Sequence, residues 1–175
     1  MADPLSPSIR PRVRLRRNLK PGDIGAVVQL HGVWYSAEYG YDRTFEGYVA
    51  AGMAEWMSSY DPAWDRLWVA ETGSRWVGSI AIVKRPLMEA QLRWFLIHPE
   101  FRGQGLGRKM VRAAIDFARE GGYRKIYLWT VNGLEAAQYL YTQAGFIKTE
   151  DHFHRIWGKD ISEERYELPL EAPSP

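Results

Sequence analysis

The feature of the sequence that most constrains its fold is a glycine-rich segment, Arg102-Gly-Gln-Gly-Leu-Gly107. Residues 90–97 before it are dense in large apolar side chains, which is typical of a buried strand. Residues 105–120 after it repeat apolar side chains three and four positions apart, which predicts a helix with one buried face. The first turn of a helix presents free backbone N–H groups, and glycines let a ligand approach them closely. The pattern predicts an anion-binding loop between a strand and a helix.

Two familiar glycine loops that bind phosphate require residues that this segment lacks. A Walker A loop needs Lys followed by Ser or Thr after its second glycine, and Arg108-Lys109-Met110 does not supply that pair. A dinucleotide-binding loop needs a third glycine where Arg108 stands. The spacing therefore disfavours nucleoside triphosphates and dinucleotides as ligands. The alternative that stays open is a glycine turn with no ligand.

The remaining pattern predicts one α/β domain, in which helices flank a mixed sheet on both faces. Asp23 and Thr44 are the predicted N-caps of two early helices. The expected element order is β-α-α-β-β-β-α-β-α-β-β, with strands near residues 13–15, 67–70, 76–83, 90–97, 125–130, 146–149 and 165–168. We expect a flexible N-terminus over residues 1–10, a single domain over 11–170 and a flexible C-terminus over 171–175.

Composition narrows the class of protein. The formal net charge is +2, which is too small to argue for nucleic-acid binding. No apolar stretch approaches the roughly 20 residues of a membrane span, and no signal-peptide core follows the first Met. The chain has no cysteine, so disulfides, thiolate metal sites and a cysteine nucleophile are excluded. We expect a cytoplasmic protein with no membrane or nucleic-acid partner and no bound metal.

Two spaced motifs in this order resemble one known family. The first is Arg102-x-x-Gly105-x-Gly107, preceded by Ile97-His-Pro99. The second is Ala137-x-x-Leu140-Tyr141-x-x-x-Gly145-Phe146. Together they resemble the GNAT superfamily of N-acetyltransferases, whose fold has a mixed, mostly antiparallel central sheet.

The resemblance extends to segments outside the two motifs. They are similar to acetyltransferase domains that elsewhere follow a MarR-type winged helix, and they comprise residues 92–97, 127–130, Trp157-Gly158 and 164–167.

The resemblance implies that acetyl-CoA is the co-substrate and that no metal takes part. The strand before the glycine loop would be bulged, would separate from the next strand and would contact the pantetheine arm. Backbone amides of the loop would hold the pyrophosphate. The implied cofactor-binding residues are Phe95, Leu96, Ile97, Arg102, Gly103, Gln104, Gly105, Leu106, Gly107 and Arg108.

The resemblance also implies a general acid, Tyr141, because a phenol of pKa about 10 can protonate a CoA thiolate. Helix periodicity alone predicts that Tyr141 is a core residue on the buried face of an amphipathic helix. Several family members use a Glu as base where this chain has Gln91. Glu89 shares a strand face with Gln91 and is the candidate base, with an ordinary surface carboxylate as the alternative. An Asn of the family, seven residues before the tyrosine, is replaced by Leu134.

The predicted reaction is acetyl transfer to a primary amine of a small molecule or peptide. Trp34, Tyr35 and Glu38 are the candidate acceptor-binding residues, because the resemblance implies that acceptor residues come from the first two helices, their connection and the late hairpin. The alternative is that the aromatic rings of this region only pack the two helices against the sheet. The alternative is a non-catalytic acyl-CoA-binding module, favoured by the departures at Gln91 and Leu134. His152-x-His154 is expected to lie in a polar loop rather than to bind a metal. A homodimer is possible by analogy with the family.

Overall fold

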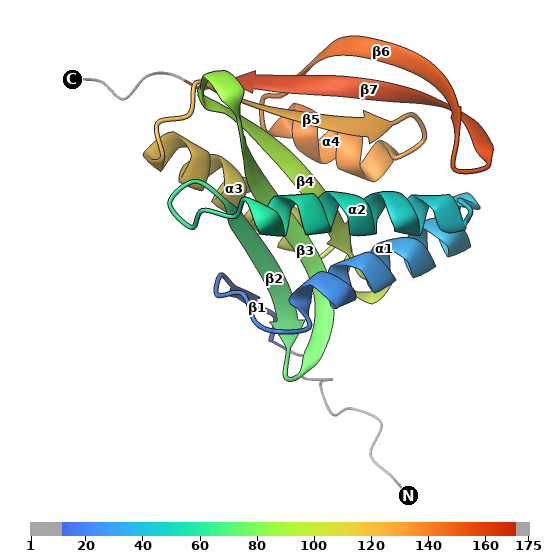
Figure 1. Ribbon diagram of the computed structural model, residues 1–175, viewed down its shortest axis with the longest axis horizontal. Coiled ribbons are helices and arrows are strands. Elements are labelled where there is room, and N and C mark those ends of the chain that lie inside the picture. Colours follow the sequence, from blue (N-terminus) through green and yellow to red (C-terminus); the bar gives the residue numbers. More distant parts are fainter. Residues whose placement is uncertain (1–11, 171–175) are drawn as a thin grey trace, which may run out of the picture.

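The structure, a computed structural model, describes residues 12–170, and its elements follow the predicted order. Figure 1 shows a central sheet with helices on both of its sides. The strands are β1 (Arg14–Arg16), β2 (Arg66–Thr72), β3 (Arg75–Arg85), β4 (Glu89–Ile97), β5 (Lys125–Val131), β6 (Ile147–Ile156) and β7 (Lys159–Pro169). The helices are α1 (Asp23–Tyr39), α2 (Arg43–Ser58), α3 (Leu106–Glu120) and α4 (Glu135–Gln143).

The seven strands form one sheet in the order β1-β2-β3-β4-β5-β7-β6. Every neighbouring pair is antiparallel except β4 and β5, which run parallel. The connection between these two strands contains α3, as a parallel pair requires a crossover of this kind. The expectation of a mixed, mostly antiparallel sheet flanked by helices is confirmed.

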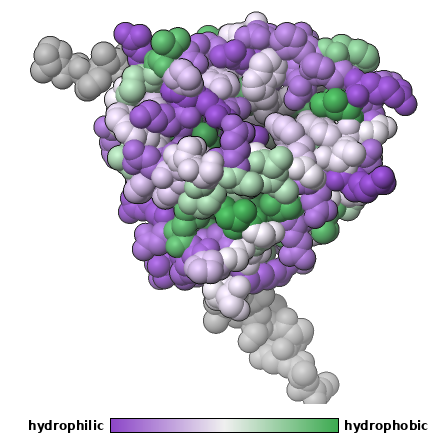
Figure 2. Space-filling model, viewed as in Figure 1, coloured by the Kyte–Doolittle hydropathy of each residue, from purple (hydrophilic) through white to green (hydrophobic). Residues whose placement is uncertain are grey.

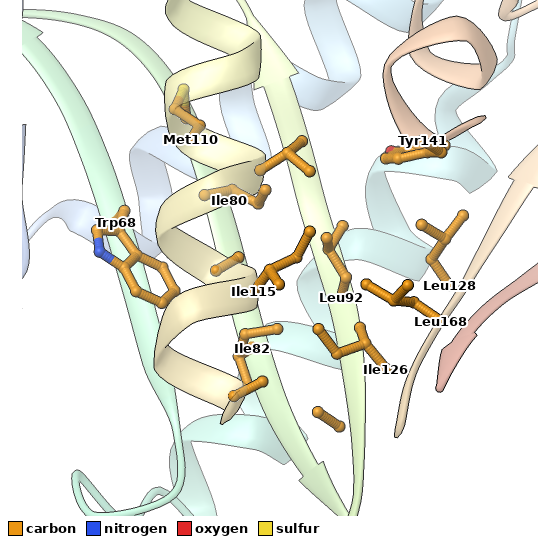
Figure 3. Packing of buried hydrophobic residues seen from close by; sticks show 14 of the residues in the cluster. Trp68, Ile80, Ile82, Leu92, Met110, Ile115, Ile126, Leu128, Tyr141 and Leu168 are labelled. Carbon is orange, nitrogen blue, oxygen red and sulfur yellow. The ribbon is translucent and has the colours of Figure 1, made fainter. Parts of the chain in front are cut away.

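Each face of the sheet has its own hydrophobic core. Helices α1 and α2 cover one face, where Phe45, Val49 and Met53 pack on Leu67 and Ala81. On the other face, α3 and α4 cover a larger core, shown in Figure 3. Its labelled members are Trp68, Ile80, Ile82, Leu92, Met110, Ile115, Ile126, Leu128, Tyr141 and Leu168. The two cores pack against opposite faces of the sheet, and they fix the positions of β4 and β5 between the helix pairs.

Both predicted N-caps of the early helices are wrong. Gly22 precedes α1 with φ 94°, and Asp23 is the first residue of the helix. The Asp23 carboxylate accepts two hydrogen bonds from Arg16 at 2.8 and 2.9 Å, so it joins β1 to α1 as a buried ion pair. Helix α2 is capped by Asp42, which accepts from the backbone N–H of Thr44 at 2.9 Å. Sequence identifies good capping residues, but the turn geometry selects among them.

The C-terminal strands are longer than predicted. The expected strands at 146–149 and 165–168 extend into a hairpin, β6 and β7, that pairs from Ile147 with Glu167 to Ile156 with Lys159. His152 and His154 therefore lie on the edge strand β6 and not in a loop. They bind Glu150 and Glu163, respectively, at 3.1 Å. No group of three or more His, Cys, Asp or Glu side chains in residues 12–170 is arranged to hold a metal ion.

The surface over α1 and α2 is mixed in character. Figure 2 shows it as mostly hydrophilic, with a band of hydrophobic residues across it. Exposed apolar side chains on these two helices include Val33 and Tyr48. Within the described range, no helix is both long and apolar enough to cross a lipid bilayer.

Candidate active site

Strand β4 is distorted in its second half. Trp94 has φ 49°, a left-handed conformation that side chains other than glycine rarely adopt. The pairing of β4 with β3 shifts register at this point, between Ser79 and Ala81. The Ser79 hydroxyl donates to the Trp94 carbonyl at 2.7 Å and holds the bulge in place. Bulges of this kind bend a strand and redirect its side chains.

In the same half of the strand β4 also separates from β5. The parallel pairing covers only Glu89 to Gln91 of β4 against Lys125 to Tyr127 of β5. From Leu92 onward, β4 therefore has a backbone edge with no β5 partner. A groove of about 480 Å³ lies there, and we call it the glycine-loop groove. It is lined by Phe95, Leu96 and Ile97 of β4, by the glycine loop, by α1 and by residues 133–140.

The glycine loop opens α3 at one end of this groove. Gly105 is the N-cap residue of α3 with φ 81°, and Gly103 has φ 71°. A Cβ at either position would meet no atom within 4 Å, so their backbone conformation, and not crowding, requires glycine. The free N–H groups of the first turn and the helix dipole make this end of the groove favourable for an anion.

Gly107 is a glycine for a different reason. A Cβ there would lie 2.7 Å from Cδ1 of Leu140 and 3.2 Å from Cδ1 of Ile97. The residue therefore allows α3, α4 and β4 to meet closely. The two sequence motifs thus contact each other directly at Gly107 and Leu140.

Arginines flank the loop in two different roles. Arg102 donates from Nε to the Ile97 carbonyl and from a guanidinium nitrogen to Glu38, each at 2.8 Å. It thereby ties the loop to β4 and to α1. Arg108 is exposed and has no ion-pair partner within residues 12–170. Its charge is available to a ligand in the groove.

A second opening, which we call the aromatic cavity, meets the groove. Its volume is about 120 Å³, a quarter of that of the groove. It is lined by His31, Tyr35, Tyr41, Phe45, Tyr48, Val49, Gln91, Leu92, Arg93, Trp94, Phe95, Trp129, Thr130, Val131, Leu134, Ala137, Tyr141, Trp157 and Glu163. Tyr35, Phe95, Leu134 and Ala137 line both spaces, so the two adjoin at the gap between β4 and β5.

Tyr141 reaches the aromatic cavity through that gap. It belongs to the core beneath α3 and α4, at the edge of the cluster drawn in Figure 3. Burial raises the pKa of its hydroxyl well above the ordinary value, and neighbouring Tyr35 adds to the shift. The hydroxyl has no hydrogen-bond partner in the described part of the chain, yet it is not among the fully enclosed polar atoms. It is therefore a protonated hydroxyl that can donate a hydrogen bond, although the raised pKa makes it a weaker acid than an exposed phenol.

His31 of α1 is a second polar group in the cavity wall. Its Nδ1 lies 2.8 Å from the Val27 carbonyl, which can only accept, so Nδ1 carries the proton and Nε2 has the lone pair. Burial lowers the pKa of His31 to about 4, so the ring is neutral near pH 7. The ring stacks on Tyr35 with centroids 5.8 Å apart.

The residues predicted to bind acceptor separate into two places. Tyr35 lines the aromatic cavity, whereas Trp34 and Glu38 line only the glycine-loop groove. Trp34 packs edge-on against His98 at 4.8 Å, and Glu38 binds Arg102.

Among the predicted cofactor residues, two do not line the groove. Gln104 donates to the Glu100 carbonyl at 2.9 Å, and the Leu106 side chain is in the core. The other members of that set, Phe95, Leu96, Ile97, Arg102, Gly103, Gly105, Gly107 and Arg108, line the groove together.

Glu89 lies at the start of β4, outside the residues that line either space. Its carboxylate forms an ion pair with Lys125 at 3.2 Å. Three polar residues of the cavity, His31, Arg93 and Glu163, belong to no motif of the sequence. They come from α1, β4 and β7, and no spacing in the sequence marks them as neighbours.

The sequence compares directly with known proteins. The model of the Acetyltransferase (GNAT) family matches residues 29–146, which is more than half of the chain. The chain belongs to the GNAT acetyltransferase family. The matched range begins within α1 and includes the bulged strand, the glycine loop and Tyr141, so most of the residues that line the two openings fall within it.

Curated relatives of this GNAT chain are named as N-acetyltransferases. It is 33% identical over 137 residues to N-acetyltransferase family 8 member 3 of Rattus norvegicus, covering 75% of this chain and 60% of the relative. It is 32% identical over 136 residues to N-acetyltransferase 8B of Homo sapiens, covering 74% and 60%. The chain thus matches about three fifths of the length of these relatives.

Solved structures share the fold. A putative acetyltransferase from Acinetobacter baylyi has a TM-score of 0.74 at 16% identity, with 93% of this chain and 95% of that chain covered. A putative acetyltransferase from Salmonella typhimurium, solved with its cofactor acetyl-CoA, has a TM-score of 0.72 at 19% identity, covering 93% and 96%.

Proposed function

We propose that this protein is an N-acetyltransferase that transfers the acetyl group of acetyl-CoA to a primary amine of a small molecule or peptide. One observation carries the proposal. The glycine-loop groove and the aromatic cavity adjoin where β4 and β5 separate, and Tyr141 lines the cavity at that point. Two ligands bound in these spaces would meet beside a protonated hydroxyl.

The glycine-loop groove would hold acetyl-CoA. It has about four times the volume of the cavity, which matches the larger of the two reactants. The free edge of β4 can pair with the amides of the pantetheine arm as an added strand does. The first-turn amides of α3 and the Arg108 guanidinium would receive the pyrophosphate.

Transfer would proceed by direct attack. The nitrogen of the neutral amine attacks the thioester carbonyl carbon, the C–S bond breaks, and the CoA thiolate leaves. Tyr141 donates its proton to that thiolate, and the amine proton passes to a base. Holding both reactants at the gap makes the step effectively unimolecular, which supplies part of the rate enhancement.

Three groups are candidates for the base. The sequence-based candidate, Glu89, is paired with Lys125 outside the cavity and would act only through water. Glu163 and His31 both line the cavity. Glu163 binds His154 at 3.1 Å, and His31 presents a lone pair at Nε2. The proposal therefore extends the candidate set to the two groups in the cavity wall.

Two finer parts of the proposal concern ancestry and assembly. The segments 92–97 and 127–130 support a relationship to the acetyltransferase domains that elsewhere follow a MarR-type winged helix. The exposed edge of β6 could pair with the same edge of a second copy, which would give a homodimer. The competing function, an acyl-CoA-binding module without turnover, is favoured only by Gln91 and Leu134.

The test is a measurement of acetyl-CoA binding and of amine-dependent thiol release on the same preparation. We expect micromolar or tighter binding of acetyl-CoA and release of thiol only when an acceptable amine is present. Binding without turnover on a broad amine panel would favour the module. Gly105→Glu is the control, because it adds a repelling charge at the N-cap of α3. Unchanged acetyl-CoA affinity in that variant would contradict both functions.

A further inference from the structure

Arg93 is the one arginine in the wall of the aromatic cavity, and it has no carboxylate partner within residues 12–170. Its guanidinium stacks over the Trp94 ring at 4.6 Å and approaches the Tyr48 hydroxyl at 3.4 Å. A Cβ on Gly52 of α2 would lie 2.9 Å from a guanidinium nitrogen, so the helix leaves room for this group. The cation is therefore held in a defined position without an anion.

Arg93 also lines a further opening together with Glu55, Asp61 and Asp65, but none of these carboxylates forms an ion pair with it in the described residues. Asp65 is buried beside the same stretch of β4 and accepts from the backbone N–H groups of Lys84 and Asp61 at 2.8 and 2.9 Å. Glu163, in the cavity wall, binds His154. Glu55 is exposed on α2 and forms no ion pair within the described chain. None of these groups neutralises Arg93.

Several hydrogen-bond donors near Arg93 have no acceptor among residues 12–170. The Gln91 carbonyl oxygen accepts from Arg85 at 2.8 Å, which leaves the amide nitrogen of Gln91 free to donate. The indole N–H groups of Trp94 and Trp56 are buried and have no partner in the part of the chain that the structure describes, and the two rings lie 5.4 Å apart. A region that combines an unpaired cation with unpaired donors favours a ligand that carries negative charge and accepts hydrogen bonds.

We propose that Arg93, together with the amide of Gln91, forms a subsite for an anionic group of the acceptor. The inference rests on the proposed function and narrows its substrate to an amine that carries a carboxylate or a related oxyanion. Arg binds such groups with paired N–H donors in one plane. A Glu at position 91 would repel that anion, so the replacement of the family's Glu by Gln91 has a physical reason here.

The remainder of the acceptor is apolar. Tyr35, Phe45, Trp129 and Trp157 line the cavity, and their rings suit an aromatic or branched aliphatic substituent. A molecule that combines a primary amine, a nearby oxyanion and an apolar substituent matches the cation, the amide and the rings that line this cavity. Hydrophobic amino acids and their phosphonate analogues have this chemistry.

The first experiment compares matched amines at saturating acetyl-CoA. The pairs are L-phenylalanine with phenethylamine and L-leucine with 3-methylbutylamine, and L-phenylalanine amide and 1-amino-2-phenylethylphosphonate complete the set. We expect kcat/KM to be roughly ten- to a hundred-fold higher for the anionic member of each pair. Phenylalanine amide should behave as the decarboxylated amine does, because it keeps the size and loses the charge.

The second experiment tests the residue. Arg93→Gln should abolish the preference for the anionic member through KM, whereas Arg93→Lys should retain part of it. Arg66→Gln is the matched control, because Arg66 also stacks on an aromatic ring, Phe117, at 4.5 Å but lies outside both openings. Acetyl-CoA affinity should be unchanged in all three variants, which shows that they fold.

Two results would overturn the inference. One is equal kcat/KM for both members of every pair in the wild type, and the other is an unchanged preference in Arg93→Gln. In both cases amine-dependent turnover persists, so the proposed acetyltransferase function stands. Acetyl-CoA binding with no turnover on any amine would instead reject the proposed function and the subsite with it.

Discussion

The rings of Phe95 on β4 and Tyr141 on α4 lie 6.1 Å apart, centroid to centroid, across the gap between β4 and β5. Phe95 lines both the glycine-loop groove and the aromatic cavity, whereas Tyr141 lines only the cavity. The pair therefore stands where the proposed donor and acceptor would meet. It also joins the two motifs of the sequence, since one residue leads into the glycine loop and the other belongs to the downstream segment.

Tyr141→Phe should lower kcat by roughly a hundred-fold or more, in line with the loss of a general acid. The ring and its packing remain, and the hydroxyl has no partner in the described chain, so thermal stability should change little. The measurement is steady-state thiol release together with calorimetric titration of acetyl-CoA. An unchanged kcat would remove Tyr141 from the mechanism, whereas weaker acetyl-CoA binding alone would give it a binding role.

Alanine substitutions at Gly105 and at Gly107 should impair different properties of the protein. Gly105→Ala forces a side chain into φ 81°, which costs about 1–2 kcal/mol and distorts the anion-binding turn, so acetyl-CoA affinity should fall. Gly107→Ala places a methyl 2.7 Å from Leu140, and overpacking of this kind costs about 1–3 kcal/mol of folding stability. Urea unfolding and acetyl-CoA titration separate the two effects.

Gly47→Ala is the control for this glycine pair. It lies within α2, where a Cβ meets no atom within 4 Å, so it should stabilise the protein by about 0.5–1 kcal/mol. Equal losses of stability and affinity in Gly105→Ala and Gly107→Ala would contradict the distinction between a conformational and a packing glycine.

Glu163→Gln and Glu89→Gln compare the cavity carboxylate with the sequence-based candidate. If the base lies in the cavity wall, Glu163→Gln should lower kcat/KM at least ten-fold. Glu89→Gln should then change stability slightly, through its half-buried ion pair with Lys125, and leave kcat/KM unchanged. The reverse outcome would return the role to Glu89 acting through water.

The burial of His31 as a neutral ring should make the folded protein less stable in mild acid than at neutral pH. Its pKa is about 4 in the folded state and near 6.5 when unfolded, so the unfolded chain binds more protons between these values. Stability from this group is complete above pH 6.5 and declines as the pH falls toward 4, by about 3 kcal/mol in total.

Denaturant unfolding at pH 7, 5.5 and 4.5 measures the His31 effect. His31→Gln should be less stable at pH 7 but should lose less stability on acidification than the wild type does. Parallel pH profiles of the two proteins would mean that His31 is not buried as a neutral ring. A steeper profile in the variant would require a different group.

Local patterns in the sequence were enough to predict the structural features that depend on residues close together in the chain. The strand-loop-helix unit around Gly105, the element order and the second motif ending at Phe146 are all read from spacing within about ten residues. Such spacing reflects backbone conformation and the buried face of an element, both of which are local properties. Where more than one residue could cap a helix, as near Asp23 and Thr44, the predicted caps were wrong. There a distant partner or the turn geometry determined which residue precedes the helix.

By itself, then, the sequence determined the fold class and the family, through the glycine loop and the tyrosine motif. Only the tertiary structure decided which side chains share the cavity. The bulge at Trp94 and the short pairing of β4 with β5 open a gap, and Tyr141 from one face and His31 from the other line the same cavity there. The tertiary structure also pairs Glu89 with Lys125, and it leaves Arg93 without a carboxylate partner in the described chain. Periodicity says which face of an element is buried, but not which faces of distant elements come together.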